Sequence, residues 1–250
     1  MRVARLYRHP VKGLTPEPLQ SATLVEGAHF PCDRLFALEN GPSGFDPEAP
    51  MHLPKIKFLM LMRNGRLAGL ATRYDDASKT LTIRLEGKLV AQGRLDRPEG
   101  HAAIENYLTA FLGEEIRGPV RLLTAPDGHR FMDSKSGFVS LLNLASVEAI
   151  AEAVGKAVDA LRFRANIHLG DMAPWAETEL VGKTLTLGGA KLEVLKMIDR
   201  CAATGVDPGT GARDMDIVDT LRKRFGHIDC GVYARVLEGG EIKIGDVARA

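Results

Sequence analysis

A cysteine opens a loop in which its thiol could serve as a metal ligand or a nucleophile. Cys201 follows Arg200 at the end of an apolar run and precedes segment 204–211, which is rich in Thr, Asp, Pro and Gly. A neighbouring cation favours the thiolate, the form of cysteine that binds metals and attacks electrophiles. Free cysteines are usually small buried hydrophobic residues, but this loop is too polar and too rich in glycine for a core position. The pattern indicates a thiolate presented to a ligand or substrate.

Three other segments concentrate side chains that bind phosphate. They are His9–Gly13, Cys32–Arg34 and Arg162–Asn166. The fork of an arginine binds phosphate through two parallel hydrogen bonds, and a lysine adds a point charge. A single basic residue in a loop is usually solvated surface, so the prediction depends on the combination of these segments with the cysteine loop.

Polar residues before a predicted helix and inside the cysteine loop are further candidates. Ser140 and Asn143 precede a helix that Ser146 is expected to cap, and helix N-termini attract anions. We therefore expect Ser140 and Asn143 to complete a phosphate pocket. Thr204 and Asp207 lie close to the cysteine in sequence and could orient it or transfer protons, although an aspartate before a proline commonly sets a turn.

The composition is that of an ordinary folded protein. Of its 250 residues, 45% are hydrophobic and 26% are charged, and the formal net charge is +1. This balance gives no bulk basic field for nucleic acid. The apolar run 58–62 is too short to span a bilayer, and the first ten residues lack the apolar stretch of a signal peptide. We expect no nucleic-acid partner, no membrane association and a cytoplasmic location.

Cysteine usage agrees with a reducing compartment. Cys32, Cys201 and Cys230 leave an odd thiol under any intramolecular pairing and show no C-x-x-C spacing. This argues against a disulfide framework and against a structural zinc site. Cys32 and Cys230 are interpreted as structural, with Cys32 the better candidate for a secondary role.

Short alternating runs separated by turn signals predict a strongly β architecture. Hairpin turns are expected at Gly188-Gly189, Asn64-Gly65, Gly87 and Gly239-Gly240. Helical spacing appears in three segments, 104–112, 147–154 and 217–225, each followed by a glycine. The predicted fold class is α+β, with mainly antiparallel, barrel-like sheets and a few helices. A composition shift at 117–119 marks the expected boundary between two domains.

The order of these segments resembles the MOSC family, the molybdenum cofactor sulfurase C-terminal domain, with its N-terminal β-barrel domain. Tyr7–Gly13 is similar to the family's Tyr-Pro-Val-Lys-Ser start, and Cys32–Phe36 to its Asp-Arg-aromatic segment. The most specific pair is Arg162–Ile167, similar to Arg-Phe-Arg-Pro-Asn-Ile, and Arg200–Gly211, similar to the cysteine loop. The resemblance implies a smaller N-terminal β-rich domain over 1–117 and a MOSC domain over 118–250, to whose barrel the first strand can contribute.

A molybdenum cofactor site follows from this resemblance. In the amidoxime-reducing branch, the counterpart of Cys201 ligates molybdenum through sulfur. A thiolate is a soft donor suited to a redox-active metal, and Asp207 joins it as a catalytic candidate. The residues expected to bind the cofactor are Lys12, Gly13, Arg34, Ser140, Asn143, Arg162, Arg164, Asn166 and Thr204. For Asn166, hydrogen bonding to the local backbone is an equally natural role. Pyridoxal phosphate is not expected.

The implied function is a molybdenum-dependent oxidoreductase that reduces N-oxygenated small molecules by oxygen-atom transfer. The chain has no four-cysteine set for an iron–sulfur cluster, so a separate donor protein of ferredoxin or flavin reductase type would supply electrons. Two alternatives remain open. One is a sulfur carrier or sulfurtransferase that uses a Cys201 persulfide, and the other is a non-catalytic carrier of the cofactor.

The sequence departs from the family pattern at two places. Gly13 stands where a serine is common, which removes one side-chain hydrogen bond to the cofactor. Met51–Lys55 replaces a Thr-x-Arg-x-x-Pro segment. His52 and Lys55 are the side chains that could substitute there, although a lone histidine or lysine in such a loop is usually exposed.

Overall fold

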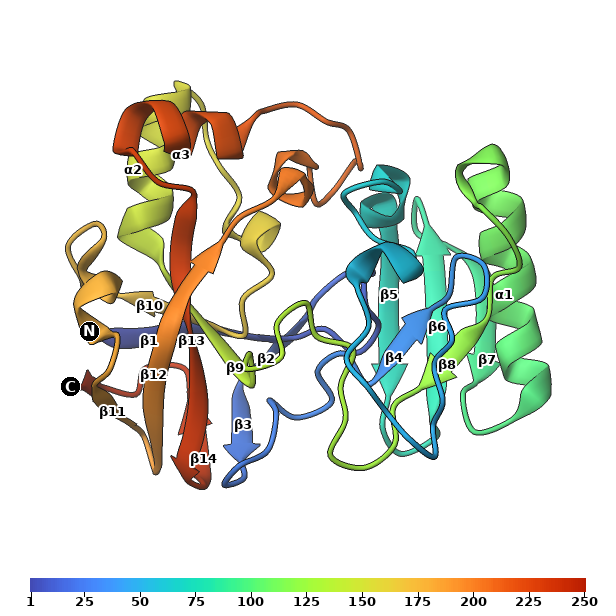
Figure 1. Ribbon diagram of the computed structural model, residues 1–250, viewed down its shortest axis with the longest axis horizontal. Helices are drawn as coiled ribbons and strands as arrows, with labels where there is room; N and C mark the ends of the chain where they lie inside the picture. Colours follow the sequence, from blue (N-terminus) through green and yellow to red (C-terminus); the bar gives the residue numbers. More distant parts are fainter.

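The computed structural model describes residues 1–250 and divides into two lobes (Figure 1). Both chain ends lie in one lobe, together with helices α2 (Leu144–Val154) and α3 (Ile217–Phe225). Helix α1 (Pro98–Leu112) lies at the far side of the other lobe. None of the helices combines the length and the apolar character needed to cross a bilayer.

An eight-stranded sheet that curls into a half-barrel forms the first lobe. Its strands, in spatial order, are β15 (Ala248–Arg249), β11 (Thr184–Leu187), β12 (Ala190–Asp199), β13 (Asp229–Glu238), β9 (Val139–Asn143), β10 (Ile167–Gly170), β1 (Arg2–Arg8) and β2 (Glu17–Leu19). Only β9 and β10 are parallel, so the sheet is mainly antiparallel, as predicted. Alternate residues of β11 are buried, which is the pattern of a strand with one face on a core.

The second lobe is built from smaller sheets around its own core of 19 buried residues. Its strands are β4 (Phe36–Leu38) paired with β8 (Leu122–Thr124), and the meander of β5 (Leu70–Asp75), β6 (Thr80–Leu85) and β7 (Lys88–Arg94). Helix α1 covers β7, and the contact needs glycine because a Cβ on Gly100 would lie 2.0 Å from the carbonyl oxygen of Arg94. Short 3-10 helices η1 (Lys55–Lys57), η2 (Gly65–Gly69) and η3 (Gly113–Glu115) complete the lobe.

The beginning of the chain folds with its second half. β1 pairs with β10, and β3 (Ser21–Leu24) pairs with β14 (Gly240–Lys243). Val3 and Leu6 are buried in the same core of 20 residues as the side chains of β11 to β13. The first strand therefore belongs to the half-barrel, while the boundary between 117 and 118 stays a prediction.

The three predicted helices are confirmed, with one correction at a helix start. α1 and α3 end at Gly113 and Gly226, and the Asp216 side chain caps α3 by accepting from the Asp219 amide. For α2 the cap is Asn143, whose side chain accepts from the Ala145 amide at 3.0 Å. Ser146 lies inside the first turn instead, and its hydroxyl donates to buried Glu177 at 2.8 Å.

Two of the four predicted hairpins are confirmed and two are wrong. β11 and β12 turn at Gly188-Gly189, and β6 and β7 turn at Gly87. Asn64-Gly65 instead begins η2, where a Cβ on Gly65 would lie 2.8 Å from the Gly211 carbonyl oxygen. After Gly239-Gly240 the chain pairs with β3 and not with β13. Gly65 and Gly239 therefore allow close packing against segments that are distant in the sequence.

Replacement of Asn143 by alanine is expected to lower the free energy of unfolding by about 2 kcal/mol. It removes the α2 cap and also a 2.8 Å donor to the buried carboxylate of Glu177. Urea denaturation of Asn143→Ala beside Glu148→Ala, an exposed change on the same helix, tests this. Equal stability of the two variants would contradict the assignment of the cap.

Candidate functional site

A cavity of about 190 Å³ lies between the two lobes and collects most of the predicted site residues. The β1–β2 connection contributes Lys12 and Gly13, and the turn before β4 contributes Arg34. Its other lining residues include Lys55, Met60, Met62, Met132, Asp133, Ser140, Arg162, Arg164, Asp199, Arg200, Cys201, Thr204 and Tyr233. The structure does not bring Asn143, Asn166 or Asp207 to this lining.

Cys201 lies where β12 ends and the 3-10 helix η6 (Ala202–Gly205) begins, and it is half-buried at the cavity wall. Its carbonyl oxygen accepts from the Thr204 amide at 3.0 Å and from the Thr204 hydroxyl at 2.9 Å. These bonds fix the backbone around the cysteine, which is itself part of the cavity lining. Thr204 therefore holds the loop from within the lining.

Lys55 and Arg200 are both close enough to Cys201 for its negative charge to affect their pKa. The buried Arg200 guanidinium donates to the carbonyl oxygens of Cys230 at 2.7 Å and Phe163 at 2.9 Å. Lys55 comes from η1 of the other lobe and lines the same cavity as Cys201. Burial alone would lower the pKa of Lys55, but the charges of Cys201 and Asp133 outweigh it and raise that pKa.

Lys12 is a buried ammonium held by two acceptors. It donates to the Phe131 carbonyl oxygen at 2.9 Å and to the carboxylate of Asp133. Burial lowers the pKa of Lys12, and the positive charges of Arg34 and Arg164 add to this effect. Gly13 has φ +82°, and a Cβ there would lie 3.0 Å from the Leu59 carbonyl oxygen. Glycine at this position therefore suits the local backbone, while a serine would be strained.

Arg34 is oriented by a buried histidine and carboxylate. Its guanidinium pairs with Asp33, and its Nη1 lies 3.0 Å from His9 Nδ1. The Asp33 carboxylate also accepts from the His9 backbone amide at 2.7 Å. Although burial opposes ionisation, Arg34 and His9 hold the pKa of Asp33 well below its usual range. Burial and the charge of Arg34 lower the pKa of His9, so this imidazole is neutral at pH 7.

Arg164 brings a second guanidinium beside Arg34 with incomplete protein contacts. Its Nη1 donates to the Leu14 carbonyl oxygen at 2.7 Å, while its Nη2 is buried without any hydrogen-bond partner. Burial and the Arg34 charge lower the pKa of Arg164 to about 9. Two adjacent guanidinium groups with an unpartnered donor form a site that a bound anion would stabilise.

Arg162 lines the cavity, but its fork is engaged by the cysteine loop. It forms ion pairs with Asp207 at 3.2 Å and with Asp214 at 2.8 Å. The other Asp207 oxygen accepts from the amides of Gly209 at 3.0 Å and Thr210 at 2.8 Å. These bonds outweigh burial and lower the pKa of Asp207. Arg162 and Asp207 thus shape the loop, and both carboxylate oxygens of Asp207 have partners within the protein.

The two predicted asparagines have structural partners instead of cavity contacts. Asn166 is fully buried, and its Oδ1 accepts from the Ser140 amide at 3.0 Å and hydroxyl at 2.8 Å. Its Nδ2 donates to the Tyr7 carbonyl oxygen at 3.3 Å. Asn166 therefore ties β1 to β9, and Ser140 reaches the cavity with its hydroxyl held by Asn166. Asn143 caps α2.

Several lining residues lie outside the predicted set of site residues, and three of them are polar groups of interest. Asp133 pairs with Lys12, and Tyr233 and Lys55 line the cavity with it. Asp133 and Tyr233 carried no distinguishing spacing, whereas Lys55 was offered only as a side chain that could replace a family residue or stay exposed. A signal for Lys55 did exist, because it follows a proline and precedes a strongly apolar run, as residues at the edge of a folded core do.

The amino-acid sequence also matches two known domain families. Residues 1–115 match the MOSC N-terminal beta barrel domain, and residues 128–249 match the MOSC domain. The chain belongs to the MOSC family. MOSC domains are associated with binding of the molybdenum cofactor and with sulfurase-related proteins.

Individual relatives of this MOSC protein are distant. It is 31% identical over 112 residues to the molybdenum cofactor sulfurase of Caenorhabditis elegans, a match that covers 41% of this chain and 16% of that relative. Among solved structures, the YuaD protein of Bacillus subtilis is 12% identical with a TM-score of 0.47, covering 99% of this chain and 93% of that one. YiiM of Geobacillus stearothermophilus is 19% identical with a TM-score of 0.38, covering 51% and 65%.

Proposed function

We propose that this MOSC protein binds the molybdenum cofactor between its lobes and reduces N-oxygenated small molecules by oxygen-atom transfer. One observation carries the proposal. Cys201 and Arg164 line one cavity, and the buried Nη2 of Arg164 has no hydrogen-bond partner in the protein. A soft metal ligand and an unsatisfied phosphate donor in one cavity match the two ends of a phosphorylated pterin that carries molybdenum.

The donor set fits this cofactor. No group of three or more His, Cys, Asp or Glu side chains is arranged to bind a metal ion. A metal that arrives with ligands of its own needs little more than one thiolate from the protein, and Cys201 provides it. Lys12, Arg34 and Arg164 supply the positive charge for the phosphate and pterin. When bound, the cofactor supplies a metal that exchanges an oxygen atom and two electrons.

The protein's own residues then have defined tasks. Cys201 ligates the metal, and Thr204 and Arg162 hold the loop that carries it. His9 and Asp33 orient Arg34 toward its anion. Electrons would come from a separate donor of ferredoxin or flavin reductase type, and a cytoplasmic location forms part of the same proposal.

Molybdenum and released pterin in the purified protein provide the test. Wild type from a host that makes the cofactor is expected to contain close to one molybdenum per chain, and Cys201→Ser to lose most of it. Elemental mass spectrometry after anaerobic purification measures this. Cys32→Ser is the matched control, since Cys32 lies outside the cavity lining and donates to Asp76. Folded wild type without metal and pterin, made in a competent host, would refute the proposal.

A sulfur carrier is the second candidate, and the place of the Lys55 ammonium in the same cavity as Cys201 favours it specifically. An ammonium beside the sulfur stabilises a persulfide anion as well as a thiolate. Labile sulfur trapped on Cys201 in metal-free protein would support this candidate. Tight binding of the cofactor without turnover, followed by its release to an apo-enzyme, would instead indicate a carrier of the cofactor.

A further inference from the structure

Six cationic side chains line the cavity, and five of them are held by oxygen atoms of the protein. These five are Lys12, Arg34, Arg162, Arg164 and Arg200. Their hydrogen bonds fix their positions and leave little freedom to follow a small molecule. They form a rigid positive wall.

Lys55 is the exception. It lines the same cavity as Cys201, but its ammonium makes no hydrogen bond or ion pair to any other protein side chain or backbone group. It is half-buried and comes from η1, on the lobe opposite the cysteine loop. The nearby carboxylates attract Lys55 without forming an ion pair with it, because Asp133 is paired with Lys12 and Asp199 is exposed to solvent.

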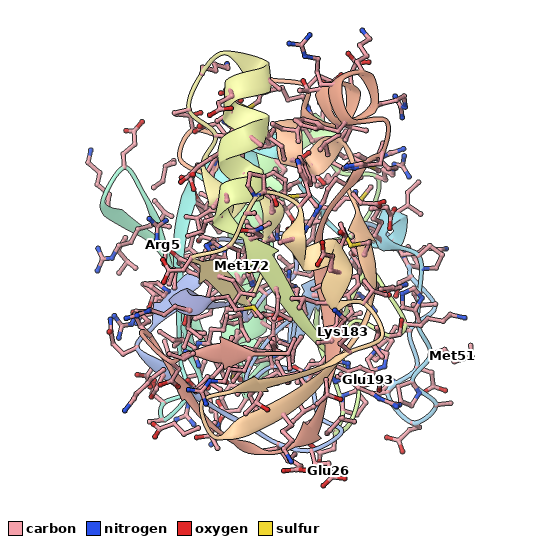
Figure 2. The ribbon with its side chains drawn as sticks, turned by 90° about the vertical axis from the view of Figure 1, so that its left-hand side faces the viewer. Arg5, Glu26, Met51, Met172, Lys183 and Glu193 are labelled. Atoms are coloured by element: carbon pink, nitrogen blue, oxygen red, sulfur yellow. The ribbon has the colours of Figure 1, made fainter.

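The position of Lys55 in its segment differs from that of an ordinary lysine on the protein surface. Met51, at the start of the segment, extends outward at the edge of the molecule and is 69% exposed (Figure 2). By Phe58 the chain is buried, so Lys55 lies where the segment passes from solvent into the core. Met60, Met62 and Met132 line the cavity beside it with apolar, adaptable surface.

We infer that Lys55 is a specificity-determining residue that binds a negatively charged group of the small molecule reduced in this cavity. The substrates it selects are N-oxygenated compounds with a carboxylate beside an apolar body, which the methionines contact. This rests on the proposed function. With Cys201 engaged as a metal ligand, the Lys55 ammonium would be available to the anionic group of the substrate.

Alkylation of Cys201 tests the charge selectivity without any cofactor. Iodoacetate is anionic and iodoacetamide is neutral, and both react with the same thiolate, so the ratio of their rates cancels the thiol's ionisation. In metal-free Lys55→Met, this ratio at Cys201 is expected to fall about tenfold from wild type. Mass spectrometry of the Cys201 peptide measures the rates. Lys57→Met, an exposed change on the same 3-10 helix, should stay within about twofold of wild type.

Turnover by the molybdenum-loaded protein tests the substrate class. An aromatic amidoxime is compared with the same molecule bearing a carboxylate. Lys55→Met should reduce kcat/KM for the carboxylate at least about tenfold and for the neutral compound less than about threefold, while Lys55→Glu should reverse the preference. The molybdenum content of the Lys55→Met protein should match that of wild type.

The two readouts separate failure of the inference from failure of the proposed function. An unchanged iodoacetate-to-iodoacetamide ratio in Lys55→Met would overturn the inference, whatever the protein catalyses. A tenfold fall in that ratio, with metal-loaded wild type reducing neither amidoxime, would uphold anion selection by Lys55 and refute the reduction of N-oxygenated compounds.

Discussion

Asp33→Asn is expected to lower the free energy of unfolding by about 3 to 5 kcal/mol, the usual cost of breaking a buried ion pair. Asp33 is fully buried, and its carboxylate accepts from the His9 amide and the Arg34 guanidinium. Asparagine keeps the shape but removes the charge, and its amide group competes with Arg34 as a donor. The Arg34 cation is then left without its counter-ion.

The pH dependence of this loss has a definite sign. Because the folded protein holds the pKa of Asp33 below its unfolded value of about 3.9, the carboxylate stabilises the fold fully above that value. The contribution disappears as pH falls toward the folded pKa. Urea titrations should therefore show a large difference between wild type and Asp33→Asn at pH 7 and a smaller one near pH 3. Exposed Asp127→Asn is the control, and a loss at pH 7 no larger than in this control would contradict the prediction.

Gly231→Ala is expected to destabilise the protein by about 3 kcal/mol and to disturb the wall behind the cysteine. Gly231 has φ +81°, and a Cβ there would lie 2.5 Å from the Leu141 carbonyl oxygen and 3.0 Å from Arg200 Nη2. The left-handed conformation costs a non-glycine residue about 1 kcal/mol, and overpacking against backbone adds about 2. Because Arg200 must shift, alkylation of Cys201 should also change its rate.

Gly226→Ala separates these two contributions. Gly226 has nearly the same backbone conformation, at φ +78°, but open space where a Cβ would stand. Gly226→Ala should lower the free energy of unfolding only by the conformational contribution, about 1 kcal/mol. Thermal and urea unfolding of both variants, with the alkylation rate of each, make the comparison. If both lose the same stability, the close approach of β13 to β9 is not what requires glycine.

Local signals predicted the elements whose geometry is decided locally. The β11–β12 hairpin needs only alternation and a turn, and α3 needs only its Asp216 cap and Gly226 end. Gly65 and Gly239 carried the same turn signal, yet each is required for close contact with a segment far away in sequence. A turn dipeptide alone does not distinguish these two uses of glycine.

For the site, the sequence predicted residue types better than it predicted their partners. One cavity brings together Lys12, Arg34, Arg164 and Cys201. Asn166 instead forms its side-chain hydrogen bonds with Ser140 and Tyr7. An unpaired polar group is costly to bury, so some polar residues near any site must form hydrogen bonds with other buried polar groups of the protein. Which of them face the ligand depends on tertiary neighbours, and no spacing along the chain shows it.

The pairing of β1 with β10 also sets the order in which the protein can mature. Residues 2–8 leave the ribosome long before their partner strand at 167–170. The cavity also needs Tyr233, which is synthesised later still. Contacts across such separations form slowly, because a long loop must close before they are made. The binding cavity therefore assembles only after the strand that carries Tyr233 has been made, and we expect a ligand to enter after that point.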